Sequence, residues 1–365
     1  MTAGLYVHVP FCLTRCGYCD FNAYAGLGHL ADRYVDALQR EADLVAGEWR
    51  DERFASVFLG GGTPTTLEPS HLESLLVHFR DSFDIAPDAE ITIEANPDTV
   101  DEPKLAAQRD AGYTRLSMGA QSFDEGVLLS LERVHSPDSV RRAFAAARAA
   151  GHDNVNLDLI YGAEGETLES WRRTLEETIE LDPEHVSAYA LTIEPATPLG
   201  REVATGRRPA PDPDLQADMF TLACELLGAA GYEHYEISNW AKPGRECVHN
   251  LGYWESRPYL GLGAGAHSYR ADRRWWNLRP PQQYLDTVES GQQPTGGEEL
   301  LTHDDRRLEL VSLGLRTTRG LAVDDIDLAK VQPFLEVGLV IRSNGHLVIT
   351  ERGMLLANEV ALALA

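Results

Sequence analysis

Residues 5–21 read Leu-Tyr-Val-His-Val-Pro-Phe-Cys-Leu-Thr-Arg-Cys-Gly-Tyr-Cys-Asp-Phe and place Cys12, Cys16 and Cys19 in the spacing Cys-x-x-x-Cys-x-x-Cys. Thiolates are soft ligands that suit iron-sulfur clusters, and a short loop can hold three corners of a four-iron cluster. Such a loop leaves one iron without a protein ligand. That iron can bind the amine and carboxylate of a small molecule and pass it an electron. The spacing therefore predicts a [4Fe-4S] cluster with one open iron.

A structural zinc site and a disulfide framework are the two other interpretations of these cysteines. Zinc takes four ligands, usually as two spaced pairs, whereas His8 is the only other soft ligand nearby and is expected within the preceding strand. Five cysteines in 365 residues are too few, and odd in number, for a secreted disulfide scaffold. The cluster is therefore the preferred interpretation, and zinc the weaker one.

The composition is typical of a soluble intracellular protein. With 365 residues and 43% hydrophobic side chains, the chain can bury a large core and form a second, smaller domain. The sequence contains no signal-peptide pattern and no apolar run long enough to cross a bilayer, so we expect a cytoplasmic protein. Its 57 acidic and 32 basic side chains give a formal charge of -25, which argues against nucleic acid as a partner.

A short apolar strand followed by an amphipathic helix recurs six times in the first 230 residues. The strands are expected near residues 5–9, 56–59, 90–94, 115–118, 154–160 and 185–191. The helices are expected near residues 30–44, 70–83, 102–111, 137–150, 168–181 and 214–230, with Ser70, Asp101 and Ser136 as N-caps. This alternation predicts an α/β fold with parallel strands and right-handed crossovers. Six units are fewer than the eight of a closed barrel.

Polar and glycine residues follow several of these strands, at the end where a parallel barrel carries its chemistry. Gly-Gly-Gly-Thr-Pro-Thr at 60–65 follows the second strand, and glycines let a ligand approach the main chain closely. Glu94 ends the third strand, Gln121 follows the fourth, and Asp158 lies within the fifth. A carboxylate inside an apolar strand is unfavourable unless it has a partner. The ammonium, hydroxyl or sulfonium groups of a ligand would be suitable partners.

These motifs resemble the radical S-adenosylmethionine (SAM) superfamily and, more narrowly, the oxygen-independent coproporphyrinogen III oxidase (HemN-like) family. The narrower resemblance is carried by residues 60–65 and by Asp-Leu-Ile-Tyr-Gly at 158–162, and it covers essentially the whole chain. It implies an open six-unit (β/α) radical SAM partial barrel with a [4Fe-4S] cluster on Cys12, Cys16 and Cys19. It also implies that SAM is bound. The implied cofactor-binding residues are Tyr6, Tyr18, Gly61, Gly62, Thr63, Glu94, Gln121, Arg133 and Asp158.

The resemblance also implies what these residues do. Tyr18 is expected to pack beside the adenine of SAM, and residues 61–63 are expected to hold the SAM together with Glu94. The neighbouring pocket is expected to be lined by Gln121, Arg133 and Asp158. Taken by itself, Arg133 would be predicted as a surface helix residue, so only the resemblance brings it into the site.

The family contains porphyrinogen oxidases and heme chaperones, and two departures from the oxidase pattern favour the chaperone branch. The oxidases carry a fourth cysteine two residues after the third, where this chain has Phe21. They also carry a long amino-terminal segment, whereas the first strand is expected here at residue 5. In addition, His-Asn-Leu-Gly-Tyr-Trp at 249–254 matches the His-Asn-x-x-Tyr-Trp motif that accompanies heme binding in the chaperone branch.

Local chemistry leaves two interpretations of this motif. On its own it favours a core-facing aromatic cluster capped by a hydrogen-bonded histidine, since short motifs match by chance. With the resemblance added, we predict that His249 binds heme, because histidine supplies an axial nitrogen to heme iron and the two aromatic residues can cover the macrocycle. Cys247 could supply a thiolate instead or be an inert thiol. Cys224 is predicted to be a packing residue.

The chain is expected to divide into three parts. Residues 1–235 would form the radical SAM core barrel, 236–297 a connecting segment with the histidine motif, and 298–365 a small winged-helix-like C-terminal domain of the HemN type. Winged helices often bind DNA, but this segment lacks the excess of lysine and arginine that DNA requires. A role as a lid or as a docking surface for a partner fits better.

The resulting prediction is a heme chaperone that binds heme and transfers it to recipient proteins, using a [4Fe-4S] cluster and SAM. The alternative is a radical SAM oxidoreductase that decarboxylates coproporphyrinogen III, and the chaperone would have no classical enzymatic turnover. Expected partners are heme and heme-accepting apoproteins, and nucleic acid is not expected. Membrane-associated recipients and a homodimer are both compatible with this role.

Overall fold

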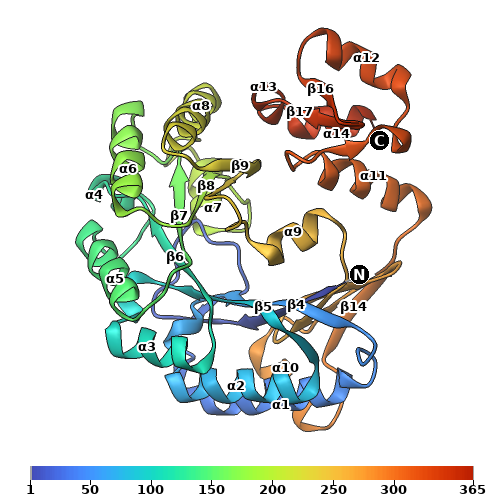
Figure 1. Ribbon diagram of the computed structural model, residues 1–365. Helices are drawn as coiled ribbons and strands as arrows, with labels where there is room; N and C mark the ends of the chain where they lie inside the picture. Colours follow the sequence, from blue (N-terminus) through green and yellow to red (C-terminus); the bar gives the residue numbers. More distant parts are fainter. Residues whose placement is uncertain (1, 365) are drawn as a thin grey trace.

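The computed structural model describes residues 2–364, and its largest element is a twelve-stranded sheet in the order β14-β13-β12-β11-β1-β4-β5-β6-β7-β8-β10-β9 (Figure 1). The strands of the predicted repeat are β1 (Ala3–Val9), β4 (Arg53–Gly61), β5 (Asp84–Ala95), β6 (Arg115–Gln121), β7 (Val155–Tyr161) and β8 (His185–Ala190). They are neighbours in sequence order and all parallel. The two ends of the strand order do not pair with each other. The predicted open barrel of six units is therefore confirmed.

The helices of the repeat lie along the outer side of the curved sheet (Figure 1). They are α1 (Ala31–Ala46), α2 (Pro69–Ser82), α3 (Glu102–Ala111), α5 (Pro137–Ala149), α6 (Leu168–Leu181) and α8 (Pro213–Ala229). Asp101 and Ser136 cap their helices as predicted, each accepting a main-chain hydrogen bond. The predicted cap at Ser70 is wrong, because α2 begins one residue earlier with a proline, which tolerates the unbonded first position. None of the helices in residues 2–364 has the length and apolar character that a bilayer crossing needs.

Several short elements lie in the loops of the barrel. They are β2 (Phe11–Cys12), β3 (Tyr24–Ala25), α4 (Glu125–Ser130), α7 (Pro198–Ala204) and the 3-10 turns η1 (Gly28–Leu30), η2 (Pro64–Thr66) and η3 (Pro97–Thr99). The two-residue strands β2 and β3 pair with each other in parallel on either side of the cysteine loop. This pairing brings the two ends of the cysteine loop together.

The part of the chain after α8 extends both edges of the sheet. Its elements are β9 (Glu233–Glu236), β10 (Asn239–Ala241), α9 (Val248–Trp254), β11 (Tyr259–Leu262), β12 (His267–Arg270), β13 (Arg273–Asn277), α10 (Pro281–Glu289) and β14 (Thr295–Leu300). β10 pairs antiparallel with β8, whereas β11 runs parallel to β1 on the opposite side. The expected connecting segment at 236–297 thus contributes strands to both edges of the barrel sheet. The three-part division of the chain stays a prediction.

The C-terminal elements form a separate small unit beside the barrel (Figure 1). They are α11 (His303–Gly314), β15 (Leu321–Ala322), η4 (Val323–Asp325), α12 (Leu328–Glu336), β16 (Val340–Ser343), β17 (His346–Ile349), α13 (Glu351–Met354) and α14 (Ala357–Leu364). The strands form an antiparallel sheet in the order β15-β17-β16. A hairpin turn joins β16 to β17 at Asn344 and Gly345, whose φ angles of 48° and 81° suit a tight hairpin of the I′ type.

The small unit is joined to the barrel through β9 and the turn after it. The Thr318 amide donates to the Tyr235 carbonyl at 3.0 Å, and the Ile237 amide donates to the Arg316 carbonyl at 3.2 Å. The Arg316 guanidinium also lies 3.4 Å from the buried carboxylate of Glu236. Main-chain bonds of this kind continue the edge of the barrel sheet into the C-terminal unit.

Glu41 links the first helix to the far edge of the barrel. It is 2% exposed and accepts hydrogen bonds from the Gly263 amide at 2.8 Å, the Tyr284 hydroxyl at 2.6 Å and Asn277 Nδ2 at 2.5 Å. Burial raises the pKa of Glu41 to about 7, and the three donors counteract that rise. One carboxyl group thereby joins α1 to β13, α10 and the loop after β11.

We expect Glu41→Ala to destabilise the protein by about 3 kcal/mol or more, because a buried donor left without an acceptor costs about 1–3 kcal/mol. Urea unfolding of the full chain, followed by far-ultraviolet circular dichroism, measures the change. The matched control is Asp36→Ala, which removes an exposed carboxylate from the same helix. Equal unfolding midpoints for the two variants would contradict the structural role of Glu41.

Candidate functional site

The three cysteines predicted to bind a cluster are free and half-buried at the carboxyl end of β1. Two neighbours contact their sulfur atoms: the Thr63 hydroxyl donates to Cys12 Sγ at 3.6 Å, and Arg133 Nη1 donates to Cys16 Sγ at 3.5 Å. Burial raises the pKa of Cys12 and of Cys19. The thiols therefore ionise most readily when a metal takes up the negative charge.

The spacing of these sulfur atoms fits a cluster better than one zinc ion. In a tetrahedral zinc site with Zn–S bonds of about 2.3 Å, neighbouring sulfur atoms lie roughly 3.8 Å apart. The sulfur atoms of Cys12, Cys16 and Cys19 do not all lie within 4.8 Å of one another. His8 lies in β1 as expected, and both of its ring nitrogens are in hydrogen bonds, with Tyr6 and with the Asn22 carbonyl. Thus His8 has no free nitrogen for zinc, whereas three separated thiols suit the corners of a cluster.

A cavity of about 530 Å³ lies beside the cysteine loop. The predicted site residues that line it are Cys12, Cys16, Tyr18, Cys19, Gly61, Gly62, Thr63, Glu94, Gln121, Arg133 and Asp158. Tyr6 and His249 do not line it, but both border a smaller cavity of about 170 Å³ that shares Glu94 and Asp158 with the larger one. The structure thus gathers the predicted residues around two neighbouring cavities that share Glu94 and Asp158.

The glycines at 60–62 were expected to let a ligand approach the main chain. In the structure they let the loop after β4 pack closely against its neighbours. The Gly62 amide donates to the Val9 carbonyl at 2.8 Å, and the Thr63 amide donates to the Phe11 carbonyl at 2.7 Å, so these amides already have partners within the protein. A Cβ at Gly62 would lie 2.6 Å from the Phe11 carbonyl oxygen, and Gly61 has a φ of 104°. The glycines are required for close packing against the cysteine loop, and Gly61 and Gly62 still border the cavity.

Two half-buried carboxyl groups, Glu94 and Asp158, border the cavity. Burial and the nearby charge of Asp158 raise the pKa of Glu94 to about 8, although the Gly61 amide donates to Glu94 Oε2 at 3.0 Å. Burial also raises the pKa of Asp158, which accepts hydrogen bonds from Ser117 at 3.0 Å and from Asn156 at 2.9 Å. A cationic group in the cavity would stabilise both carboxylates. The site is therefore electrostatically suited to an ammonium or sulfonium ligand.

Gln121 and Arg133 meet at a distortion of the sheet. Gln121 ends β6 with a φ of 65°, which is uncommon for a residue other than glycine, and the β6–β7 register shifts beside it. Arg133 lies between α4 and α5 rather than on a helix, and its Nη2 donates to the Gly119 carbonyl at 3.2 Å. With Nη1 on Cys16, this guanidinium places a positive charge beside the cysteine loop.

The two predicted tyrosines lie in different surroundings. Tyr18 borders the main cavity and packs against an apolar cluster that includes Ile160 and Leu191. Tyr6 is half-buried in β1, and its hydroxyl shares a 2.9 Å hydrogen bond with His8 Nδ1. Tyr18 is therefore placed to contact a ligand of the main cavity, whereas Tyr6 supports the strand from behind the cysteine loop.

His249 lies on α9, where both of its ring nitrogens have partners. Nδ1 shares a 2.9 Å hydrogen bond with the Ser56 hydroxyl, and Nε2 shares one of 2.9 Å with the Tyr253 hydroxyl. The ring stacks on Phe58 with centroids 5.1 Å apart, and burial lowers the pKa of His249 to about 3. This is the environment of a hydrogen-bonded core histidine. His249 does not fit a heme-iron ligand in this conformation, because one hydrogen bond would have to break first.

Other residues of the site were not predicted from the sequence. Arg115 is 2% exposed and borders the smaller cavity, where its charge interacts with Glu90, Cys247 and Asp158. Its position at the start of an apolar strand was the only signal available. Cys247 is fully buried, its thiol donates to Glu90 at 3.4 Å, and burial raises its pKa to about 12, so it fits the inert alternative.

Comparisons with known proteins identify the family of this chain. The Radical SAM superfamily model matches residues 6–178, and the HemN C-terminal domain model matches residues 301–356. The heme chaperone HemW of Mycobacterium tuberculosis is 43% identical over 99% of this chain and 94% of its own length. HemW of Bacillus subtilis is 34% identical over 97% of each chain.

One solved structure matches nearly the whole fold. Coproporphyrinogen III oxidase (HemN) from Escherichia coli, described as a radical SAM enzyme, has a TM-score of 0.85 at 27% identity and covers 99% of this chain and 89% of that chain. The predicted fold class and family are confirmed. Superfamily membership implies a [4Fe-4S] cluster and SAM, and the three free thiols beside a carboxylate-lined cavity fit both groups. The chain belongs to the HemW family of radical SAM proteins.

Proposed function

We propose that this protein is a heme chaperone, which binds heme and passes it to recipient proteins. The observation that carries the proposal is the 43% identity to a heme chaperone over 99% of the chain. Phe21 supports the same conclusion, because it occupies the position of the fourth cysteine of the oxidases. We also propose that the protein acts in the cytoplasm. Membrane-associated recipient proteins and a homodimer are two further proposals.

In this proposal Cys12, Cys16 and Cys19 hold a [4Fe-4S] cluster. When bound, the cluster supplies an electron and an open iron for SAM. Thr63 and Arg133 each donate a hydrogen bond to a cysteine sulfur, which stabilises the thiolate form. The protein's own contribution is to hold three thiolates apart and to leave the cavity side of the loop accessible.

The carboxyl groups of Glu94 and Asp158 would bind the positively charged part of SAM. Both are half-buried and border the same cavity, so water screens their attraction for a cation less than at the open surface. Gly61 orients Glu94 through its amide, and Ser117 and Asn156 orient Asp158. Tyr18 supplies an aromatic surface for the adenine, while Gln121 and Arg133 line the remaining wall.

Heme has an apolar surface available at the rim of this cavity. Leu13, Phe21 and Val134 all border the cavity and are 65%, 60% and 63% exposed, so three large apolar side chains face solvent around it. Apolar patches of this kind often mark binding sites. We propose that they contact the macrocycle. The assignment of His249 as the axial ligand stays a prediction, since its nitrogens are hydrogen-bonded.

Oxidative decarboxylation of coproporphyrinogen III is the second candidate function. It is favoured by the similarity to HemN over 99% of this chain. The radical SAM core would serve both functions, so the cluster and SAM do not distinguish them. The two functions are distinguished by whether the protein transfers heme or converts the porphyrinogen.

The first prediction concerns the cluster. Anaerobic reconstitution should give one four-iron cluster per chain, and replacing Cys12, Cys16 or Cys19 with alanine should remove it, since each change deletes one of three protein ligands. Iron and sulfide analysis with electron paramagnetic resonance measures this. Cys247→Ala is the matched control, because that buried thiol lies outside the main cavity. Zinc without iron in the wild-type protein would refute the assignment.

The second prediction concerns SAM. Glu94→Ala should weaken SAM binding by about tenfold to a hundredfold, because a hydrogen bond to a charged group contributes about 1.5–3 kcal/mol. The perturbation of the reduced cluster's spectrum by SAM gives the affinity. Glu102→Ala, at an exposed glutamate of α3, is the control, and cluster content must stay unchanged in both. An unaltered affinity in Glu94→Ala would remove this residue from the SAM site.

The third prediction separates the two functions. With SAM and a strong reductant, coproporphyrinogen III should remain unconverted, whereas bound heme should move to a heme-free globin, as followed by absorption spectroscopy.

If His249 is the axial ligand, His249→Ala should shift the heme spectrum and Tyr253→Phe should strengthen heme binding, because the latter frees Nε2. Multiple turnovers of decarboxylated product would overturn the chaperone proposal. An unchanged spectrum in His249→Ala would overturn the ligand assignment alone.

A further inference from the structure

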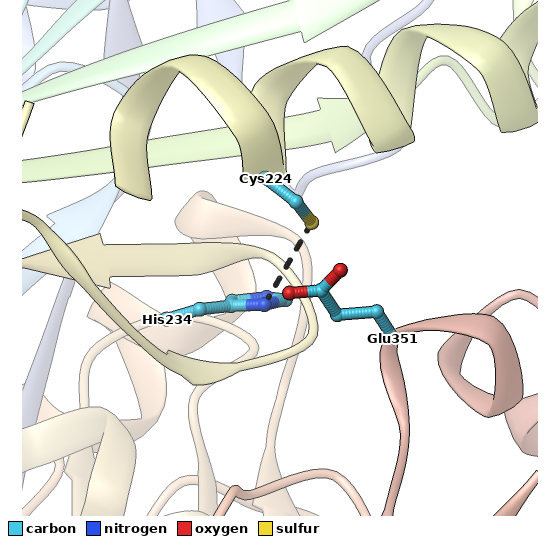
Figure 2. Close-up of side chains that lie close together, drawn as sticks. All are labelled: Cys224, His234 and Glu351. Atoms are coloured by element: carbon cyan, nitrogen blue, oxygen red, sulfur yellow. Dashed lines mark hydrogen bonds between the residues drawn. The ribbon is translucent and has the colours of Figure 1, made fainter. Parts of the chain in front are cut away.

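Cys224, His234 and Glu351 converge at the contact between the barrel and the C-terminal unit (Figure 2). Cys224 projects from α8, His234 lies on β9, and Glu351 is the first residue of α13. The sequence separates Glu351 from the other two by more than a hundred residues, and Cys224 alone was predicted to be a packing residue. The cluster therefore arises only from the docking of the C-terminal unit.

The distances within this group suit one metal ion. The sulfur of Cys224, a ring nitrogen of His234 and a carboxylate oxygen of Glu351 all lie within 4.8 Å of one another. Cys224 Sγ and His234 Nδ1 are 3.8 Å apart. With Zn–S near 2.3 Å and Zn–N near 2.05 Å, the edge of a coordination tetrahedron is roughly 3.6 Å. The thiol and the imidazole are therefore already spaced as two zinc ligands.

The imidazole of His234 is oriented for ligation through Nδ1. Its Nε2 lies 3.2 Å from the Ile237 carbonyl, which can only accept, so in the neutral ring the hydrogen is on Nε2. That leaves the Nδ1 lone pair directed at the Cys224 thiol. The ring also stacks on buried Trp240, with centroids 4.2 Å apart and planes 7° from parallel. Metal-binding histidines are held in the same way, by a backbone acceptor on the second nitrogen.

Burial and charge at the group are compatible with a cation. The Ile237 carbonyl on Nε2 leaves the Nδ1 lone pair of His234 available to a cation. On binding, the S–H proton leaves to solvent as the metal–sulfur bond forms. Thiolate and carboxylate together then balance the charge of a divalent ion.

We propose that Cys224 Sγ, His234 Nδ1 and the Glu351 carboxylate bind one divalent zinc-class ion, which ties the C-terminal unit to the barrel. Thiolate, imidazole and carboxylate are each ligands that Zn²⁺ accepts, and water would complete four-coordination beside the exposed Glu351, as at zinc sites with three protein ligands. This site shares no residue with the cysteine loop or its cavity, and the proposal does not rest on the heme function.

The location explains what the ion would do. Among the described contacts, the C-terminal unit is held to β9 and the turn after it by two main-chain hydrogen bonds, by the Thr318 hydroxyl on the Tyr235 carbonyl and by the ion pair of Arg316 with Glu236. A metal between α8, β9 and α13 would add a further link between the two units. Binding of zinc would thereby favour the docked arrangement over any in which α13 has moved away.

The test uses the full chain with Cys12, Cys16 and Cys19 replaced by serine, so that neither cluster nor zinc can occupy the cysteine loop. After treatment with a chelator, Zn²⁺ alone is titrated in against a competing indicator, and Co²⁺ serves as an optical probe for thiolate ligation. We expect one equivalent of zinc, and Glu351→Gln should weaken its binding by about tenfold or more. Cys224→Ser should remove the thiolate-to-cobalt charge-transfer absorption.

Glu359→Gln is the matched control, because it neutralises an exposed glutamate of α14 in the same unit. Glu351 is itself exposed, so its replacement leaves the core intact. Zinc should also slow amide hydrogen exchange at residues 351–354, in the cluster-loaded wild type as well. Absence of zinc binding, or equal affinities in Glu351→Gln and Glu359→Gln, would overturn the proposal and leave a thiol–imidazole contact only.

Discussion

Two main-chain hydrogen bonds determine where the cysteines lie. They join the loop after β4 to the end of β1 and to the start of β2. The amides of Gly62 and Thr63 donate to the carbonyls of Val9 and Phe11, immediately before Cys12. The contact is so close that a side chain at Gly62 would collide with main-chain oxygen. Because the same register pairs Val9 with Gly61, β1 and β4 deliver the cysteine loop and the carboxylate-lined cavity to one edge. The cluster site depends on this packing as much as on the thiols.

Around that edge the protein arranges half-buried charges that favour particular ligands. Glu94 and Asp158 lie on the cavity wall with raised pKa values, and Arg133 lies on the cysteine side. The carboxyl groups would be unfavourable in an apolar strand without the hydrogen bonds that Gly61 and Ser117 donate to them. A cation near the carboxylates would meet negative charge. The thiolates that bind the iron would meet the positive charge of the Arg133 guanidinium. The electrostatics thus separate a carboxyl-lined side of the cavity, which favours a cation, from the guanidinium side at the cysteine loop, which favours an anion.

Much of the fold follows from local sequence patterns. The six strand–helix units were predictable because apolar periodicity and capping residues such as Asp101 and Ser136 depend on neighbours along the chain. The strands β9, β10, β13 and β14 were not predicted, because they are only three to six residues long and mix polar with apolar side chains. The glycines at 60–62 were correctly placed in the site, but their packing role depends on a contact with residues some fifty positions earlier.

The sequence by itself determined the open parallel barrel and the family, and it is the source of the predicted cluster ligands, because these depend on residue type and short spacing. Tertiary structure alone decided which side chains share a bond. It placed Ser56 and Tyr253 on the two nitrogens of His249, and the first of these partners is 193 residues away. It likewise brought Glu351 to Cys224 and His234. Such contacts form when separate elements pack together to bury apolar surface, and no local pattern in the chain encodes which polar groups then meet.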